Sequence, residues 1–282
     1  MEIKIYPYRT FSRGARALAL YLAPFEQPNA KKPNPRKLLD INFFDEDGSV
    51  TTKNFMIVNW GMTAKKSFFT GNSNHYKFLN HPERVKLCND KIRFFEHVKG
   101  SSVRVPDYTV DLEQAMKWLD EGAIVLGRSS RGSGGNDIKF FDKDPEEFVE
   151  SDFFSKYKKK KEEYRIHIFN DRIICSQKKV LREFDDNGDP VDKSLVDFRI
   201  RNHTHGFIFQ KHNIDPPADV IDQARAAIEK VGLAFGAVDV IWNEYEKKAY
   251  VLEVNTAPGL EGTTVKAYGD AILDFKNSLT TP

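Results

Sequence analysis

Short apolar runs open the chain and alternate with helix-like stretches. Ile3–Tyr6 alternates in the way a strand does, and Gly14–Leu22 is rich in alanine and leucine, which is typical of a helix. Phe55–Trp60 is an almost continuous apolar run of strand length that ends at a glycine. Together these segments predict a small α/β unit that extends to about Leu87.

The middle of the chain predicts two helices and a strand–loop–strand unit. Asp90–His97 has a helical pattern, and Asp111 is placed to cap a helix that ends at about Asp120. A strand over Ala123–Leu126 then runs into a glycine-rich loop, and Asp137–Phe141 alternates again as the next strand.

The last part of the chain combines strands with one strongly marked helix. Pro217–Val231 has its apolar residues on one helical face, and Gly232 suits the position after the last turn. The predicted strands are Tyr164–Phe169, Ile173–Val180, Gly236–Trp242 and Ala249–Asn255. We therefore predict a mixed α/β (α+β) chain with a first domain over 1–87 and a second over 88–282, the latter made of subdomains 88–157 and 158–282.

The composition is that of an ordinary globular protein. Of the 282 residues, 40% are hydrophobic and 30% are charged, and 43 basic against 41 acidic side chains leave a net charge of +2. Such a balance gives no general attraction to nucleic acid or to a membrane. The sequence shows no signal-peptide pattern and no apolar run of membrane-spanning length, and Cys88 and Cys175 form no metal or redox motif. We expect a reduced, cytoplasmic setting.

Lys156–Lys161 is the one basic run of the sequence. With Phe153, Phe154 and Tyr157 as stacking partners, it allows an interpretation as a nucleic-acid contact. Two glutamates follow at once, and the favoured interpretation is therefore a solvated loop. We do not expect nucleic acid as a partner.

Three oxygen ligands come together if the last two strands form a hairpin. With a turn centred on Glu246, Asp239 and Glu253 lie directly opposite each other, and Asn255 projects to the same side. Opposed carboxylates repel each other unless a cation neutralises them. Mg²⁺ prefers oxygen ligands of this kind, so the three residues predict a magnesium site. Ion pairs with nearby Lys or Arg side chains are the alternative.

The glycine-rich loop reads “VLGRSSRGSGGN” over Val125–Asn136. Glycines let backbone N–H groups approach phosphate oxygens, and Arg128 at the strand end is placed to bind a phosphate. The spacing matches neither the P-loop nor the Rossmann motif. The alternative is a flexible hairpin tip without a ligand.

The order of these features resembles the ATP-grasp superfamily. A glycine-rich loop between strands comes first, then “AVDVIW” with its acid, then “VLEVNTAPGL” on the hairpin partner. “EVNTAPGL” is similar to D-alanine–D-alanine ligases, and “FRIRNHTHG” is similar to peptide-tagging glutamate ligases. The resemblance covers most of the chain and implies two α+β subdomains that clasp ATP, preceded by a small pre-ATP-grasp domain.

The resemblance also implies which residues bind nucleotide and metal. Lys91 takes the place of the first nucleotide-binding lysine, Arg128 stands where a second lysine is usual, and Glu163 matches the acid that contacts the ribose. The adenine hinge and the mobile loop supply the other implied contacts, namely Lys156, Tyr157, Arg131, Ser133, Gly134 and Gly135. The implied Mg²⁺ ligands, for two ions with Mn²⁺ as a substitute, are Asp239, Glu253 and Asn255.

On the substrate side, the chain departs from the D-alanine ligases. Ala237 stands where those enzymes carry an arginine, so Arg199 or Arg201 is expected to stabilise the transferring charge, with Asn202 beside them. Three further residues are expected to face the substrate: Arg165, Gly259 and Thr263.

The implied activity is ATP-dependent ligation of a carboxylate to an amine through an acyl phosphate. The expected partners are small-molecule or peptide carboxylates and amines, and the glycine-rich loop is expected to close over the nucleotide and exclude water. Two alternatives stay open. One is an ATP-grasp kinase of a small hydroxylated substrate, and the other is an ATP-binding module without catalysis.

Overall fold

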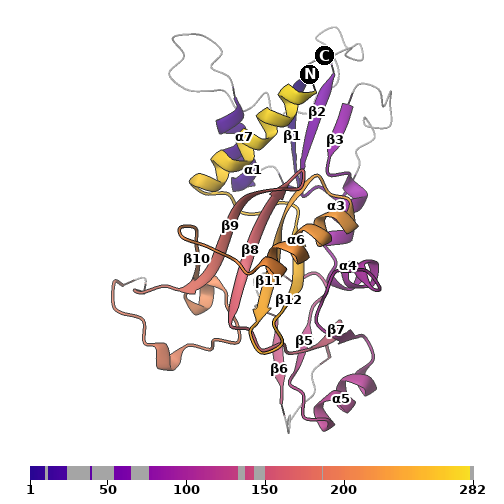
Figure 1. Ribbon diagram of the computed structural model, residues 1–282, viewed down its shortest axis with the longest axis vertical. Coiled ribbons are helices and arrows are strands. Elements are labelled where there is room, and N and C mark those ends of the chain that lie inside the picture. Colours follow the sequence, from indigo (N-terminus) through magenta and orange to yellow (C-terminus); the bar gives the residue numbers. More distant parts are fainter. Residues whose placement is uncertain are drawn as a thin grey trace.

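In the part of the chain that the structure describes, three sheets follow one another along the long axis of the molecule (Figure 1). The structure is a computed structural model that describes residues 1–9, 12–23, 39, 54–64, 76–132, 137–142, 150–185 and 187–279. None of the helices in this part of the chain is long and apolar enough to cross a membrane.

The first sheet is parallel and lies at the end of the molecule that holds the amino-terminus (Figure 1). Its strands, in spatial order, are β1 (Glu2–Pro7), β2 (Phe55–Trp60) and β3 (Tyr76–Leu79). Helix α1 (Arg13–Leu22) packs against the long C-terminal helix α7 (Thr263–Ser278). The ring of Trp60 stacks on Phe235 at 5.5 Å and meets Tyr268 edge-on at 5.3 Å. This sheet therefore shares its apolar core with the C-terminal part of the chain.

The second sheet lies at the opposite end and carries the glycine-rich loop. Its strands, in spatial order, are β4 (Tyr108–Thr109), β7 (Phe153–Lys156), β5 (Val125–Arg128) and β6 (Lys139–Phe141). Helix α5 (Leu112–Asp120) covers one face and begins at Asp111, whose side chain accepts from the Glu113 N–H, as the sequence predicts. Strand β7 was not among the predicted strands.

The third sheet is antiparallel, has five strands and forms the middle of the molecule. Its strands, in spatial order, are β10 (Phe207–Gln210), β9 (Arg172–Leu181), β8 (Glu162–Phe169), β11 (Phe235–Asn243) and β12 (Lys248–Asn255). Helix α6 (Ala218–Val231) lies across one face and ends at Gly232 in the left-handed region. The predictions for β8, β9, α6, β11 and β12 are confirmed within a few residues at each end; β10, β3, α7 and the short helix α3 (Pro82–Cys88) were missed.

The two faces of the third sheet differ in chemistry. Along β8, Tyr164, Ile166 and Ile168 belong to the apolar core under α6. Because successive strand residues point to opposite faces, the alternate residues Glu163 and Arg165 project away from α6. The sheet therefore offers a charged face to the space between it and the second sheet.

A β-bulge sets the register of the β11–β12 hairpin. Near the turn, Asn243 pairs with Lys248 and Val240 pairs with Val251, yet Asp239 pairs with Glu253. Leu252 is the extra residue of β12. The predicted opposition of Asp239 and Glu253 is confirmed, but the turn does not centre on Glu246, and the bulge is what restores the pairing.

Candidate functional site

Asp239 lies on the charged face, and Arg165 of the neighbouring strand binds both of its oxygens. The Nε–Oδ1 distance is 2.6 Å and the distance from a terminal guanidinium nitrogen to Oδ2 is 2.8 Å. The two residues are also register partners across β8 and β11. Burial alone raises the pKa of Asp239, but the charge and hydrogen bonds of Arg165 outweigh it and hold that pKa below its usual value. The carboxylate is thus kept ionised in a buried place.

Glu253 lies opposite Asp239 and is neutralised from a different element. Its Oε2 is 3.4 Å from Lys91 Nζ, and its Oε1 accepts from Asn255 Nδ2 at 3.1 Å. Lys91 is the first residue of helix α4 (Lys91–Val98), which Asp90 caps. The repulsion expected between the opposed carboxylates is therefore relieved by one arginine and one lysine.

The donor chemistry of these three residues fits a hard divalent cation. Asp239, Glu253 and Asn255 offer carboxylate and amide oxygens from two neighbouring strands, which suits Mg²⁺. Among the residues that the structure describes, no cluster of three or more His, Cys, Asp or Glu side chains has a metal-binding arrangement. The candidate set does not form such a cluster, because it has only two carboxylates and its third member is an asparagine.

The start of the glycine-rich loop is anchored to its surroundings by hydrogen bonds. The Ser130 N–H donates to Asp152 Oδ2 at 2.8 Å, its carbonyl accepts from the Lys91 N–H at 2.8 Å, and Lys91 Nζ donates to the Gly132 carbonyl. The hydrogen bond from the Ser130 N–H is the main reason why the pKa of Asp152 lies below its usual value. Arg131 lies on the surface, 3.7 Å from Asp90. Three predicted residues of this loop lie outside the described part of the chain: Ser133, Gly134 and Gly135.

Arg128 of the second sheet and Glu163 of the third sheet border the same space between the two sheets. Burial lowers the pKa of Arg128, whose guanidinium lies 5.4 Å from the ring centre of Phe153. Glu163 is 3% exposed and accepts from Lys160 at 2.8 Å and from Lys179. Burial raises the pKa of Glu163, but the charges and hydrogen bonds of the two lysines outweigh burial, so the net shift of the pKa is downward.

Sequence reasoning missed Lys160 and Lys179. The signal for Lys179 is a pair of acids on β8 followed by a pair of lysines on β9, two runs that a hairpin places side by side. Lys160 was hidden inside the basic run.

A central cavity of about 140 Å³ lies between the second and third sheets. Its described lining carries seven basic side chains and four carboxylates: Lys91, Arg128, Lys160, Arg165, Lys179, Arg199 and Arg201, with Asp137, Glu163, Asp239 and Glu253. Seven basic against four acidic side chains give the lining a formal surplus of positive charge. Such a cavity suits a polyanion with a cation beside it.

A smaller apolar cavity of about 60 Å³ adjoins the central one. Both are lined by Arg128, Ile138, Lys160, Arg199 and Leu252, and the smaller one adds the apolar side chains Leu126, Phe140 and Ile241. Its walls come from both sheets, so a flat ring would lie between them.

The predicted hinge residues Lys156 and Tyr157 both border the apolar cavity. The Tyr157 N–H donates to the Ile124 carbonyl at 2.8 Å. Lys156 Nζ lies 5.0 Å from the ring centre of Trp118, on the side of the sheet that α5 covers. Tyr157 therefore borders the cavity, while the ammonium group of Lys156 lies at α5.

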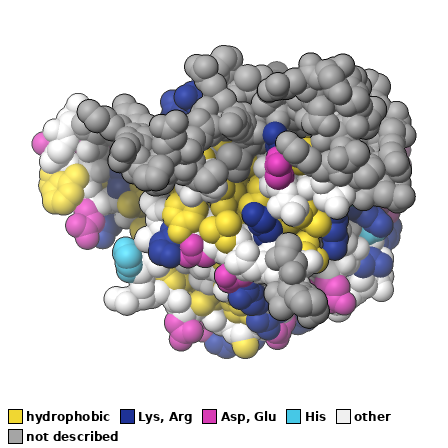
Figure 2. All heavy atoms as spheres, turned by 90° about the horizontal axis from the view of Figure 1, so that it is seen from above, with side chains coloured by type: hydrophobic (Ala, Val, Ile, Leu, Met, Phe, Trp, Pro, Cys, Tyr) yellow, Lys and Arg dark blue, Asp and Glu magenta, His cyan; other side chains and the backbone are white. Residues whose placement is uncertain are grey.

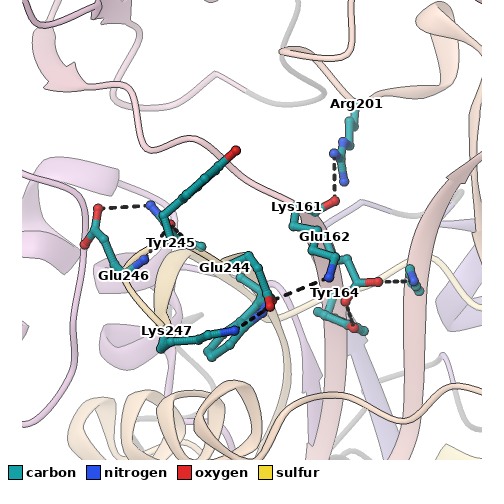
Figure 3. Close-up of polar contacts among 11 residues, drawn as sticks. Lys161, Glu162, Tyr164, Arg201, Glu244, Tyr245, Glu246 and Lys247 are labelled. Carbon is teal, nitrogen blue, oxygen red and sulfur yellow. Dashed lines mark hydrogen bonds and ion pairs between the residues drawn. The ribbon is translucent and has the colours of Figure 1, made fainter.

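The segment with the two arginines is a turn, not an extended strand. Arg199 binds Asp197, two residues earlier, with a nitrogen–oxygen distance of 2.9 Å. Arg201 donates to the Lys160 carbonyl at 3.3 Å and to the Lys161 carbonyl at 3.1 Å; Figure 3 shows the contact with Lys161. The segment therefore does not take the extended conformation that would place both guanidinium groups on one face. Both arginines and Asn202 still line the central cavity. The Nε of Arg201 is buried and has no partner among the described residues.

A third, outer cavity of about 540 Å³ lies on the other side of Lys91 and Glu253. It is bordered by the end of β12 and by the loop after β2, including Asn255 and Thr63. Gly259 and Thr263, expected at the substrate, are exposed and line neither this cavity nor the central one. Arg165, the other expected substrate residue, lines the central cavity.

The basic run is less solvated than expected. Lys158 and Lys160 have side chains 18% and 11% exposed, and Lys158 lies 3.6 Å from both Asp107 and Glu246. Lys161 lies 3.6 Å from Glu244 of the β11–β12 hairpin (Figure 3). On the face that Figure 2 shows, basic and acidic side chains are interspersed instead of being gathered by sign. The run thus serves contacts within the protein.

Comparison with known proteins gives likenesses in structure alone. No protein-family model and no curated protein sequence matches this chain. The ATP-grasp ligase PsnB, complexed with a phosphomimetic variant of its minimal precursor, Mg and ADP, superposes with a TM-score of 0.62 at 13% identity, covering 96% of this chain and 97% of that one. The chain has the ATP-grasp fold.

Two other ATP-grasp ligases agree with this assignment. The RiPP-associated ligase of Chryseobacterium gregarium, in complex with ADP and a leader and core peptide, gives a TM-score of 0.58 at 12% identity and covers 100% of this chain and 98% of that one. The D-alanine–D-alanine ligase from Bacillus anthracis gives 0.54 at 14% identity and covers 99% and 98%. The fold expected from the sequence is confirmed. In the ATP-grasp frame, the central and apolar cavities lie between the two clasping sheets.

Proposed function

We propose that this protein is an ATP-dependent ligase that joins a carboxylate to an amine through an acyl phosphate. The observation that carries the proposal is the placement of Asp239 opposite Glu253, facing a cation-lined cavity between the two sheets of an ATP-grasp fold. A binding module without catalysis has no need of two opposed carboxylates in that place. Their presence supports an enzyme.

The cavity residues divide the nucleotide between two environments. The apolar cavity beside Tyr157 takes the base, and Glu163 receives the ribose hydroxyls. Lys91, Arg128 and Lys179 hold the phosphates, because their charges line the central cavity and point to one space. The glycine-rich loop closes over the phosphates and keeps out the water that would hydrolyse an acyl phosphate.

Asp239, Glu253 and Asn255 would hold Mg²⁺, two ions in this proposal, with Mn²⁺ as a substitute. When bound, the metal supplies charge neutralisation for the triphosphate and the transferring phosphoryl group. Arg165 keeps Asp239 ionised and oriented for that role through its two hydrogen bonds.

The reaction proceeds in two displacements. An oxygen of the substrate carboxylate attacks the γ-phosphorus, the bond to the β-phosphate oxygen breaks, and ADP leaves. The amine nitrogen then attacks the acyl carbon, inorganic phosphate leaves, and the nitrogen loses a proton. Arg201 stabilises the charge that develops in these steps, since its buried Nε is a donor in need of an acceptor.

The substrate acid and amine occupy the outer cavity, which meets the central one at Lys91 and Glu253. A volume of about 540 Å³ suits an amino acid or a short peptide segment. This choice is supported by the structural neighbours, which are complexed with precursor or core peptides or named for D-alanine.

Product analysis tests the proposal. Amino acids and short peptides are screened with ATP and Mg²⁺, and ADP, inorganic phosphate and condensed product are measured together, the last by mass spectrometry. The ligase yields all three in equal amounts. ADP with a phosphorylated substrate and no free phosphate would identify a kinase instead, and ATP binding without turnover would identify a binding module.

A further inference from the structure

A buried hydroxyl borders the apolar cavity. Ser155 lies on β7 and is 1% exposed, and its Oγ has no hydrogen-bond partner among the described residues. Its register partner is Leu126 of β5, which also lines the apolar cavity. Phe154, the residue before it, packs on the α5 side of the sheet. By strand alternation, Ser155 faces the space between the two sheets.

An unsatisfied buried hydroxyl is costly, and folded proteins pair nearly all such groups. The apolar part of the cavity wall includes Leu126, Ile138 and Phe140 from one sheet and Ile241 and Leu252 from the other. Basic side chains also border the cavity, namely Arg128, Lys156, Lys158, Lys160 and Arg199. Apolar walls with a few well-placed polar groups are typical of a ligand site, and the space between the two sheets suits a flat heteroaromatic ring. The walls contact the two faces of the ring, and a polar group contacts its edge.

We propose that Ser155 is the residue that reads the edge of the purine base of the bound nucleotide. A hydroxyl both donates and accepts, so it can pair with a ring nitrogen or with an exocyclic amino group of adenine. The bond satisfies Oγ only when nucleotide is present. This inference rests on the proposed nucleotide site and adds to it a side chain that the resemblance does not assign.

The proposal predicts opposite effects of Ser155→Ala on the free and on the bound protein. In the free protein the substitution removes an unpaired buried polar group, so the melting temperature stays the same or rises. In the complex it removes one hydrogen bond, so the Kd for ATP rises about three- to tenfold. The Kd for tripolyphosphate, which has no base, stays unchanged.

Ser101→Ala is the matched control. The Ser101 hydroxyl donates to the Val98 carbonyl at 2.5 Å and accepts from the Val103 N–H at 3.2 Å. Its removal therefore lowers the melting temperature and leaves the Kd for ATP unchanged. The two variants therefore differ on both measurements: only Ser101→Ala lowers the melting temperature, and only Ser155→Ala raises the Kd for ATP.

Calorimetry and thermal melts of wild type, Ser155→Ala and Ser101→Ala with both ligands decide the matter. If Ser155→Ala binds ATP as tightly as wild type, or loses tripolyphosphate affinity by the same factor, Ser155 does not contact the base. If Ser155→Ala melts well below wild type without ligand, the hydroxyl has a structural role and the proposal fails. If the wild type itself binds no ATP, the proposed function fails first, and that result is separate from either outcome for Ser155.

Discussion

Three of the carboxylates that line the central cavity have a basic partner from a different element. Asp239 pairs with Arg165 of β8, Glu253 with Lys91 of α4, and Glu163 with Lys179 of β9 and Lys160. Burial raises the pKa of Asp239 and of Glu163, but their basic partners outweigh it and hold both pKa values below their usual range. The same lysine and arginine side chains are then placed to bind phosphate. In the proposed function, one set of basic side chains thus neutralises the free site and recognises the nucleotide.

Glu253→Gln tests the metal assignment at this scale. The substitution keeps the volume and removes the charge that would bind Mg²⁺, so we expect ATP turnover to fall by about 10²-fold. The Mg²⁺ concentration for half-maximal turnover should rise as well. Both quantities are measured by ADP release over a titration of Mg²⁺.

Glu229→Gln on α6 is the control for this experiment, since Glu229 is exposed and borders none of the three cavities. It should behave as wild type. Wild-type turnover and an unchanged Mg²⁺ requirement in Glu253→Gln would show that the metal assignment is wrong.

The two arginines of the turn are expected to differ. Arg199 is 45% exposed at its side chain and is held by Asp197, a surface pair that contributes little. Arg201 is fixed by two backbone carbonyls and has a buried, unpartnered Nε. We therefore expect Arg201→Ala to lower kcat for amide formation by about 10²–10³-fold and Arg199→Ala to lower it far less.

Measuring kcat together with the Kd for ATP separates the possible roles of Arg201. A fall in kcat with nearly unchanged ATP affinity marks action on the transition state. If both variants keep kcat within about twofold of wild type, well short of the loss typical of such a donor, the stabilising charge comes from elsewhere in the site.

At the scale of elements, the β11–β12 hairpin shows how far the sequence reaches. Period and spacing predict both strands and the opposition of Asp239 to Glu253. They do not predict the bulge at Leu252, because the strand is apolar at nearly every position from Ala249 to Val254 and has no alternation that would reveal one extra residue. Without the bulge, the register that runs from Asn243–Lys248 to Val240–Val251 would continue along the hairpin. Asp239 would then pair with Leu252, and Glu253 would point to the α6 side of the sheet. The site thus depends on an irregularity that strand periodicity does not report.

Apart from the paired acids of β8 and paired lysines of β9, the pairing of side chains from distant elements was also beyond the sequence. Lys160 and Lys179 reach Glu163 from a loop and from β9, and the turn of Arg199 depends on Asp197 and on Phe140, whose ring centre is 4.5 Å from the guanidinium. These contacts depend on three-dimensional packing between segments, which local alternation does not encode. The helix caps at Asp111 and Gly232 were predictable because they depend on neighbours in sequence.

The hairpin tip also holds the segment that follows β7. Lys158 contacts Glu246, Lys159 Nζ lies 3.3 Å from the Tyr245 hydroxyl, and Lys161 contacts Glu244. Since Tyr157 borders the apolar cavity, we expect Lys158→Met to loosen the base site. The KM for ATP should rise about three- to fivefold with kcat within twofold, because partly exposed ion pairs contribute about 1 kcal/mol at most.

Lys247→Met provides the comparison for that variant. Lys247 lies in the same hairpin and pairs with Glu244, but its side chain is 68% exposed and it does not touch the Lys158–Lys161 segment in any described contact. Its steady-state kinetics should match wild type. Equal KM values for ATP in Lys158→Met and wild type would mean that the hairpin does not position the base site.

At the scale of the whole molecule, one apolar core joins the first sheet to the C-terminal helix and to the third sheet. His167 lies at this junction, on β8 with 0% exposure, and its Nδ1 is 3.1 Å from the Tyr268 hydroxyl of α7. Burial lowers the pKa of His167 to about 4. The neutral imidazole is therefore the form that the folded protein accommodates between its parts.

The last prediction follows from that burial. Below pH 6.5 the unfolded chain binds a proton at His167, whereas the folded protein binds it only near pH 4. The stability that the neutral His167 contributes is therefore fully present above pH 6.5 and is lost as the pH falls from 6.5 towards 4. Between pH 8 and pH 5 this one group should remove about 2 kcal/mol from the free energy of unfolding. Urea unfolding at both pH values should show that loss in wild type and in His212→Gln, an exposed control, and a smaller one in His167→Gln. An NMR titration of His167 that found it protonated at pH 6 would contradict the prediction even if His167→Gln folded poorly.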